Sequence, residues 1–306
     1  MSSAVVLALL VGGVVLVVVG AELFLEGLLA AAARLGVSAF ALTALVSGFE
    51  LENIAAGIAA NVKGLENAAA GTFLGGTTFL ALAVAGLGAL VAPLRAQLPP
   101  AVLVWTAAAP IPLLLLALDG EVSRLDGGLL LGWFVLAMAG FLWRAGRGLL
   151  GVPVERKRFI LLRVLFGLAL LTAAGEMLGE GLRRVVSRFG VSETLLGNTA
   201  IAASVEAEEV ARVAVPAQRG RGDIALGNIV GTIVHFIAFN AGVIALVRPL
   251  DLDSASRWLH LPVAAASPVF LVFLLAWRGS LGRAAGALLV GLYVAYVTVA
   301  VIVAVS

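Results

Sequence analysis

Cysteine is absent from this 306-residue chain, and charged residues make up only 12% of it. Without cysteine there can be no disulfides, thiolate metal sites or thiol nucleophiles, so any metal ion would have to bind through oxygen or imidazole. Hydrophobic residues make up 62% of the sequence, and the mean hydropathy is +1.12. A chain so poor in charge cannot be an ordinary soluble domain, and the composition predicts a multi-pass membrane protein with the lipid bilayer as a partner.

Basic residues are too few to indicate nucleic-acid binding. The net charge is +2, and the longest basic tract is the three residues 156–158. We therefore expect no nucleic-acid partner. Nothing in the sequence indicates a permanently bound cofactor either.

Long apolar runs account for most of the chain, and many approach the roughly 20 residues that a helix needs to cross a bilayer. Arg, Pro, Gly and Asp separate ten such runs, so we predict an all-α fold with ten transmembrane helices. The first run has no convincing cleavage site and is predicted to be a retained span. The predicted spans are 4–32, 38–61, 66–92, 100–118, 126–149, 159–186, 192–216, 223–248, 260–277 and 283–304.

Two acidic stretches lie inside apolar runs, where charge is costly and is usually functional. The first covers residues 47–53 (Ser-Gly-Phe-Glu-Leu-Glu-Asn) and the second covers residues 204–209 (Ser-Val-Glu-Ala-Glu-Glu). One offset of 156 residues relates Glu50 to Glu206, Glu52 to Glu208, Asn53 to Glu209 and Gly71 to Gly227. The chain therefore contains an internal repeat.

The repeat divides the chain into residues 1–150 and residues 159–306, joined by a short polar linker at 151–158. Each half has five predicted spans. Because five is odd, the second half must enter the membrane upside down relative to the first, which is the inverted-repeat plan of secondary transporters. The distribution of Lys and Arg in the predicted loops places the linker in the cytoplasm and both termini outside a plasma membrane of bacterial type.

The residues around both acidic stretches resemble the cation/Ca²⁺ exchanger superfamily, which includes the Na⁺/Ca²⁺ exchangers. Its two inverted repeats each carry a motif like Gly-Thr-Ser-Leu-Pro-Glu, followed by a segment rich in Gly and Asn. Residues 190–202 lead into the second acidic stretch with the family's spacing, and residues 222–232 look like the later segment. The resemblance implies a divergent cation exchanger, and it places Glu209 at the family's ion-binding glutamate and Asn53 at the matching position of the first half.

The chain departs from this family pattern at residues that matter for sodium. The Thr-Ser pair, which supplies sodium ligands in the family, is Phe-Glu at residues 49–50 and Val-Glu at residues 205–206. The family's proline is Glu52 in the first half and Glu208 in the second. The ligand set therefore favours coupling to protons over coupling to sodium.

We expect the two acidic stretches to meet near the bilayer midplane and form an all-oxygen cation site. Residues three apart on a helix share a face, so each stretch presents two oxygen-bearing side chains to one side. Such a cage suits a hard divalent cation such as Ca²⁺ and would also accommodate Mn²⁺. The predicted metal ligands are Glu50, Asn53, Thr72, Glu206, Glu209, Asn228 and Thr232.

Further polar residues are predicted to lie near this site. Glu52 and Glu208 fall about 200° around the helix from Glu50 and Glu206, so we expect them to line a proton path or to support the ligands. His235 either serves as a metal or proton ligand or has a purely structural role. Arg212 is expected to approach the inner surface rather than to pair with a glutamate. The roles of Glu22, Glu26, Glu176 and Glu180 stay open between structural pairing and ion entry.

Carboxylates buried together cannot all remain ionised, so protons should fill the cluster when the metal ion leaves. The sequence thus predicts a secondary-active antiporter that exports a divalent cation, Ca²⁺ first, in exchange for H⁺ by alternating access. Na⁺/Ca²⁺ exchange and export of Mn²⁺ or another divalent cation are the alternatives. A cation channel fits an inverted repeat less well. An intramembrane enzyme also fits less well, because His-Glu-x-x-His, a Ser/His pair and a Cys nucleophile are all missing.

Overall fold

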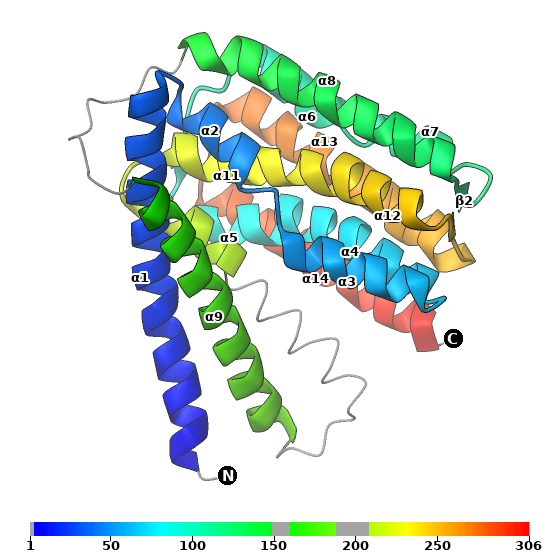
Figure 1. Cartoon of the computed structure of the whole chain (residues 1–306), viewed down its shortest axis with the longest axis horizontal. Coiled ribbons are helices and arrows are strands. Elements are labelled where there is room, and N and C mark those ends of the chain that lie inside the picture. Colours follow the sequence, from blue (N-terminus) through cyan, green and yellow to red (C-terminus); the bar gives the residue numbers. More distant parts are fainter. Residues whose placement is uncertain (1–2, 149–159, 188–207, 306) are drawn as a thin grey trace.

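The computed structural model describes residues 3–148, 160–187 and 208–305, and most of these residues are helical (Figure 1). The prediction of an all-α fold is confirmed, apart from four strands of two residues each. The elements of the first half are α1 (Ser3–Leu35), α2 (Ala39–Val46), α3 (Leu51–Val62), α4 (Glu66–Thr78), η1 (Phe79–Val84), α5 (Ala85–Val91), β1 (Leu94–Arg95), α6 (Pro100–Ala108), α7 (Ile111–Leu116), β2 (Glu121–Val122) and α8 (Arg124–Gly148).

The second half begins with α9, and residues 208–218 form a further helical segment. The remaining part of the predicted span 192–216 lies outside the described residues, as does the linker 151–158. The labelled elements of this half are α9 (Ile160–Ser187), α11 (Gly222–Val234), η2 (His235–Asn240), α12 (Ala241–Val247), β3 (Leu250–Asp251), η3 (Ser256–His260), α13 (Leu261–Arg278), β4 (Ser280–Leu281) and α14 (Arg283–Val305).

Six helical segments in the described residues are long and apolar enough to cross a bilayer. Their outward faces carry large apolar side chains, such as Leu7 and Val11 on α1 and Ile302 on α14, which is the surface that lipid requires. The six segments are Val5–Leu35, Glu66–Val91, Arg124–Phe141, Gly222–Val247, Ser256–Arg278 and Arg283–Val303. Shorter apolar helices at Asn53–Val62, Pro100–Leu116 and Leu162–Ala174 coincide with three more of the predicted spans.

The same irregular helix occurs in both halves. In each half a long helix contains a π-helical segment, as α4–η1–α5 over residues 66–91 and as α11–η2–α12 over residues 222–247. Every boundary in the first copy lies 156 residues before its counterpart in the second. The backbone therefore repeats with the offset found in the sequence.

Contacts between the halves are crosswise. Strand β1, which follows α5, pairs with β4, and strand β2 pairs with β3, which follows α12. In the same way, α5 packs on α14 while α12 packs on α8. Exchanging the two halves converts each of these contacts into its partner, as a two-fold relation requires.

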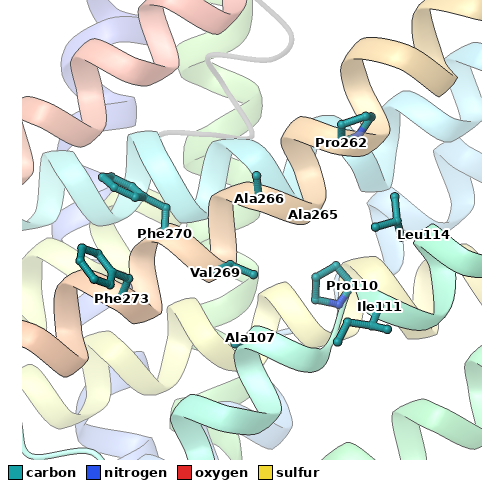
Figure 2. A pocket seen from close by; sticks show the side chains of 10 residues that line it. All are labelled: Ala107, Pro110, Ile111, Leu114, Pro262, Ala265, Ala266, Val269, Phe270 and Phe273. Atoms are coloured by element: carbon teal, nitrogen blue, oxygen red, sulfur yellow. The ribbon is translucent and has the colours of Figure 1, made fainter.

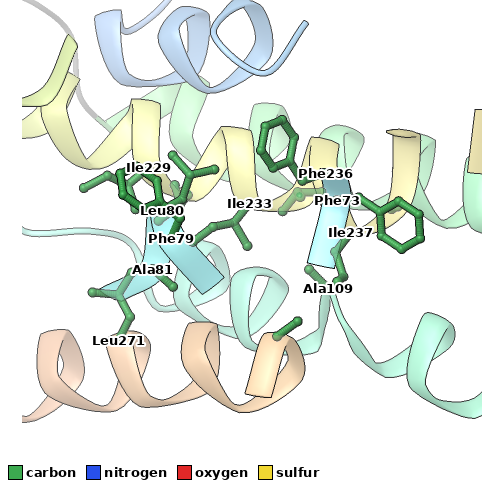
Figure 3. Close-up of a cluster of buried hydrophobic side chains, with 14 of the residues drawn as sticks. Phe73, Phe79, Leu80, Ala81, Ala109, Ile229, Ile233, Phe236, Ile237 and Leu271 are labelled. Carbon is green, nitrogen blue, oxygen red and sulfur yellow. The ribbon is translucent and has the colours of Figure 1, made fainter. Parts of the chain in front are cut away.

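The main hydrophobic core lies where the two irregular helices meet (Figure 3). Phe73, Leu80 and their neighbours on α4 and η1 pack against Ile233 and Ile237 from α11 and η2, and all four side chains are fully buried. This apolar packing keeps the central helices of the two halves side by side. A polar group buried in this region is shielded from water, so it is costly unless another protein group pairs with it.

Helices α1 and α9 form a separate pair that runs at a steep angle to the other helices (Figure 1). Glycine allows their backbones to approach closely: a Cβ at Gly167 would lie 2.6 Å from the backbone nitrogen of Phe24. An ion pair between Arg163 and Glu26, 2.7 Å long, also joins the two helices.

Candidate cation site

The first acidic stretch lies at a break between two short helices. Helix α2 begins after Ser38, whose hydroxyl accepts a 3.1 Å hydrogen bond from the backbone N–H of Ala41, and it ends at Val46. Helix α3 begins after Glu50, whose backbone angles of φ −87° and ψ 87° are not helical. The helix is thus unwound at the motif, although no proline is present there.

Gly48 lies at this break, directly against His235. A Cβ at Gly48 would come within 2.2 Å of the imidazole ring, which is closer than side chains pack. The ring is enclosed by aromatic side chains, with the centroids of Phe49 and Phe134 each 4.7 Å away. A bulkier residue at position 48 would push the unwound segment away from η2.

Three buried carboxylates converge on Arg212 at this break. Nη1 of Arg212 lies 2.5 Å from Oε1 of Glu209 and 3.5 Å from Oε1 of Glu50, while Nη2 donates a hydrogen bond to Glu208. The exposed fraction of each of these four side chains is 6% or less. Glu50 comes from the first half and the other three residues come from the second, so the cluster joins the halves.

Two predicted ligands extend this cluster through hydrogen bonds. The side-chain amide of Asn53 donates to Oε2 of Glu50 over 2.5 Å, and that of Asn228 on α11 donates to Oε2 of Glu209 over 3.0 Å. Oδ1 of Asn228 and the hydroxyl of Thr232, one helical turn later, are buried and make no hydrogen bond within the described residues. These oxygens retain the capacity to accept a donor or to ligate a cation.

Other predicted residues lie elsewhere or outside the described structure. The hydroxyl of Thr72 donates to the backbone oxygen of Ala69 over 2.7 Å, and no described contact joins Thr72 to the carboxylates. His235 has Nδ1 2.8 Å from the backbone oxygen of Gly231, and its Nε2 has no partner among the described residues. Glu206 lies outside the described residues, and the side chain of Glu52 is not described.

The structure corrects one expectation about the second acidic stretch. Arg212 does not extend to the inner surface, because two acids three and four residues before it lie within reach on the same side of the helix. Glu208, expected to line a proton path or to support the ligands, contacts the same guanidinium as Glu209.

The acids near the ends of the first and sixth predicted spans are mostly paired. Glu26 pairs with Arg163, and Glu180 pairs with Arg184 on the next turn of α9. Glu22 pairs with Arg219 at an exposed position. These contacts support the structural reading of the three acids, whereas Glu176 is exposed.

Within residues 3–148, 160–187 and 208–305, no group of three or more His, Asp or Glu side chains is arranged to hold a metal ion. The three central carboxylates converge on a guanidinium instead. A separate groove of about 600 Å³ lies between α6, α7 and α13, but its lining is apolar and includes Pro110, Pro262 and Phe270 (Figure 2). Such a groove offers no ligands to an inorganic cation.

Long apolar helices around a buried cluster of opposite charges are typical of a multi-pass membrane transporter. Residues 5–143 and 159–302 match the sodium/calcium exchanger protein family, and the chain belongs to that family. It is 29% identical to the inner membrane protein YrbG of Escherichia coli, with 94% of each chain covered. It is 28% identical to the putative antiporter CaxA of Alkalimonas amylolytica, covering 93% of this chain and 95% of the relative.

The fold is also that of a solved exchanger. The sodium-calcium exchanger NCX_Mj, soaked with zero Na⁺ and Ca²⁺, superposes with a TM-score of 0.84 over 97% of this chain and 99% of that one. The sequence identity is 21%, so this likeness concerns the fold. The family suggested by the acidic motifs is confirmed.

Proposed function

We propose that the protein is a secondary-active antiporter that exports a divalent cation, Ca²⁺ first, in exchange for H⁺. The observation that carries this proposal is the buried cluster of Glu50, Glu208 and Glu209 at the unwound motif, with acids from both halves of the chain. A site at the interface of two repeats can be opened to either side of the membrane by moving one group of helices against the other. Family membership supports cation exchange as the activity.

The proposed architecture is ten transmembrane helices in two inverted repeats of five. The crosswise pairing of β1 with β4 and of β2 with β3 supports a two-fold relation between the halves. Its axis would lie in the membrane plane, as in other inverted-repeat transporters. Both termini are proposed to lie outside, with the linker 151–158 in the cytoplasm.

The proposed ligands are oxygen atoms from both repeats. Carboxylate, amide and hydroxyl oxygens together satisfy a cation such as Ca²⁺, which takes six to eight of them. Mn²⁺ is the first alternative, because it accepts similar ligands. The proposed set is Glu50, Asn53, Thr72, Glu206, Glu209, Asn228 and Thr232, with Glu52, Glu208 and His235 as proton carriers or supporting residues.

Protons are favoured over sodium as the coupling ion because carboxylates dominate the described site. Buried carboxylates bind protons when a metal ion leaves, since unpaired negative charge is costly away from water. Phe49 and Glu50 occupy the positions of the Thr-Ser pair that supplies sodium ligands in the family pattern. Na⁺/Ca²⁺ exchange is the second candidate, and the family match favours it.

The test is uptake of ⁴⁵Ca²⁺ and Mn²⁺ by proteoliposomes holding the purified chain, with a pH gradient or a Na⁺ gradient imposed separately. We expect saturable Ca²⁺ flux driven by the pH gradient and abolished in Glu209→Gln. Flux driven only by the Na⁺ gradient would replace H⁺ with Na⁺ as the coupling ion. Absence of counterflow under both gradients would overturn the antiporter proposal.

A further inference from the structure

We propose that Arg212 is a tethered cation that occupies the transport site when no metal ion is bound, so that a divalent cation must displace it. This inference rests on the proposed function of the carboxylate cluster. Beyond the proposed ligands, it identifies Arg212 as a residue that controls the affinity for the divalent cation.

The first argument is the position of the guanidinium. Nη1 of Arg212 lies 2.5 Å from Oε1 of Glu209, 3.5 Å from Oε1 of Glu50 and 3.4 Å from the backbone oxygen of Ser47. Two carboxylates from different halves and a carbonyl of the unwound segment are the kinds of oxygen ligands that a divalent cation takes. The nitrogen therefore occupies a position that suits a bound cation.

The second argument is that the guanidinium leaves part of the site unused. Oδ1 of Asn228 and the hydroxyl of Thr232 are buried and accept no hydrogen bond from the described residues. Nε of Arg212 likewise has no acceptor among them. A compact divalent cation, with no fixed direction of bonding, can recruit oxygens that the planar guanidinium cannot reach.

The third argument is that Arg212 breaks the repeat. The equivalent position in the first half, 156 residues earlier, is Ala56, which is exposed. The repeated backbone thus does not require an arginine at this place. Within the cluster the guanidinium also lies over an aromatic ring of α1, since the ring centroid of Phe24 is 5.8 Å from the guanidinium carbon.

Arg212 also changes the charge that protons must balance. Three ionised carboxylates with one guanidinium carry a net charge of −2, and an arginine keeps its charge at any physiological pH. Two protons, rather than three, therefore suffice to neutralise the described cluster when the metal ion has left. The arginine supplies the remaining positive charge without crossing the membrane.

The experiment is equilibrium binding of ⁴⁵Ca²⁺ to the purified full-length chain in detergent at one fixed pH, with Arg212→Gln, Arg212→Lys and the unchanged protein. If the guanidinium occupies the site for about nine tenths of the time, its removal tightens the apparent Kd about tenfold. Lysine keeps the charge but lacks the two-pronged fork, so Arg212→Lys should bind with intermediate affinity. Arg163→Gln is the control, since it removes an arginine–glutamate pair away from the cluster, between α1 and α9, and should leave the Kd unchanged.

Free guanidinium ion gives an independent measurement. In Arg212→Ala, guanidinium at low millimolar concentration should compete with Ca²⁺, whereas the unchanged protein should not respond. Equal or weaker Ca²⁺ binding by Arg212→Gln, together with loss of binding in Glu209→Gln, would overturn the tethered-cation proposal and keep the proposed site. Unchanged binding in Glu209→Gln would instead remove the site itself. If Arg212→Gln does not fold, the comparison of Arg212→Lys with the unchanged protein decides the question.

Discussion

The buried ion cluster links the two halves electrostatically through one arginine and three glutamates. Removing one partner of a buried ion pair costs about 3–5 kcal/mol, because the remaining charge is left without compensation. Arg212 compensates Glu50, Glu208 and Glu209 at once. Any cation that displaces Arg212 must therefore supply at least equal compensation.

Gly48 is the residue with the least tolerance for change near the site. In Gly48→Ala the new Cβ would lie 2.2 Å from the His235 ring, so the unwound segment must shift, and we expect a loss of about 1–3 kcal/mol in unfolding free energy. Thermal unfolding in detergent measures the effect. Gly132→Ala on α8 is the control, since no described atom lies within 4 Å of its Cβ position. A Tm for Gly48→Ala equal to that of the control would contradict the close contact.

Asn228 and His235 differ in how they meet the site. Asn228→Leu removes the donor to Oε2 of Glu209 together with a free amide oxygen, so we expect weaker Ca²⁺ binding. His235→Phe keeps the packing among Phe49 and Phe134, and we expect its Kd to stay unchanged. Binding of ⁴⁵Ca²⁺ to both variants checks this contrast. A large loss of affinity in His235→Phe would make the imidazole a ligand.

The sequence predicts the acidic residues of the site better than it predicts the arginine. Glu50 is identified by its duplication as Glu206, and Glu209 by the family resemblance. The cost of charge in an apolar run singles out both acids. Arg212 lies within one turn of two acids and also within reach of a predicted membrane edge, so helical spacing alone allows either outcome. The choice depends on Glu50, which a segment more than 150 residues earlier brings to the same place.

At the scale of elements, hydropathy and punctuation predict the bounds of the irregular helix of the first half closely. The α4–η1–α5 segment covers residues 66–91, against the predicted span 66–92, because Gly64 and Pro93 flank a continuous apolar stretch. The π-helical segments η1 and η2 have no such signal. Their residues are as apolar as those of their neighbours, and packing rather than local sequence decides how many residues complete a turn.

Asn61 connects α3 of the first half to the end of α12 in the second. Its amide donates to the backbone oxygen of Arg248, 2.6 Å away, and to that of Ile244, 3.2 Å away, which also accepts a hydrogen bond from the backbone N–H of Arg248. Asn61→Leu should lower the unfolding free energy by about 1–3 kcal/mol because it removes both hydrogen bonds and leaves the backbone oxygen of Arg248 without this donor. Val62→Leu, a change at the neighbouring exposed position, is the control in thermal unfolding. Equal stability of the two variants would refute this role for Asn61.

At the scale of the whole molecule, the orientation in the membrane can be tested directly because the chain has no cysteine. Lys63→Cys lies in a predicted outer loop and Gln218→Cys in a predicted inner loop, and both positions are exposed. With a membrane-impermeant maleimide on intact cells, we expect labelling of Lys63→Cys only. Gln218→Cys should react after the cells are permeabilised. The reverse pattern would invert the proposed topology.

The crosswise pairing of β1 with β4 and of β2 with β3 suggests how a chain with two similar halves could arise. Each half offers its partner the same surfaces that it receives, so these surfaces are self-complementary in the sense of a symmetric homodimer. A polypeptide of half this length, inserted in both orientations, would find a matching copy of itself. Once two such copies are joined in one chain, each can diverge from the other. Arg212 in the second half and Ala56 at the equivalent position of the first half are such a difference, which a homodimer could not have.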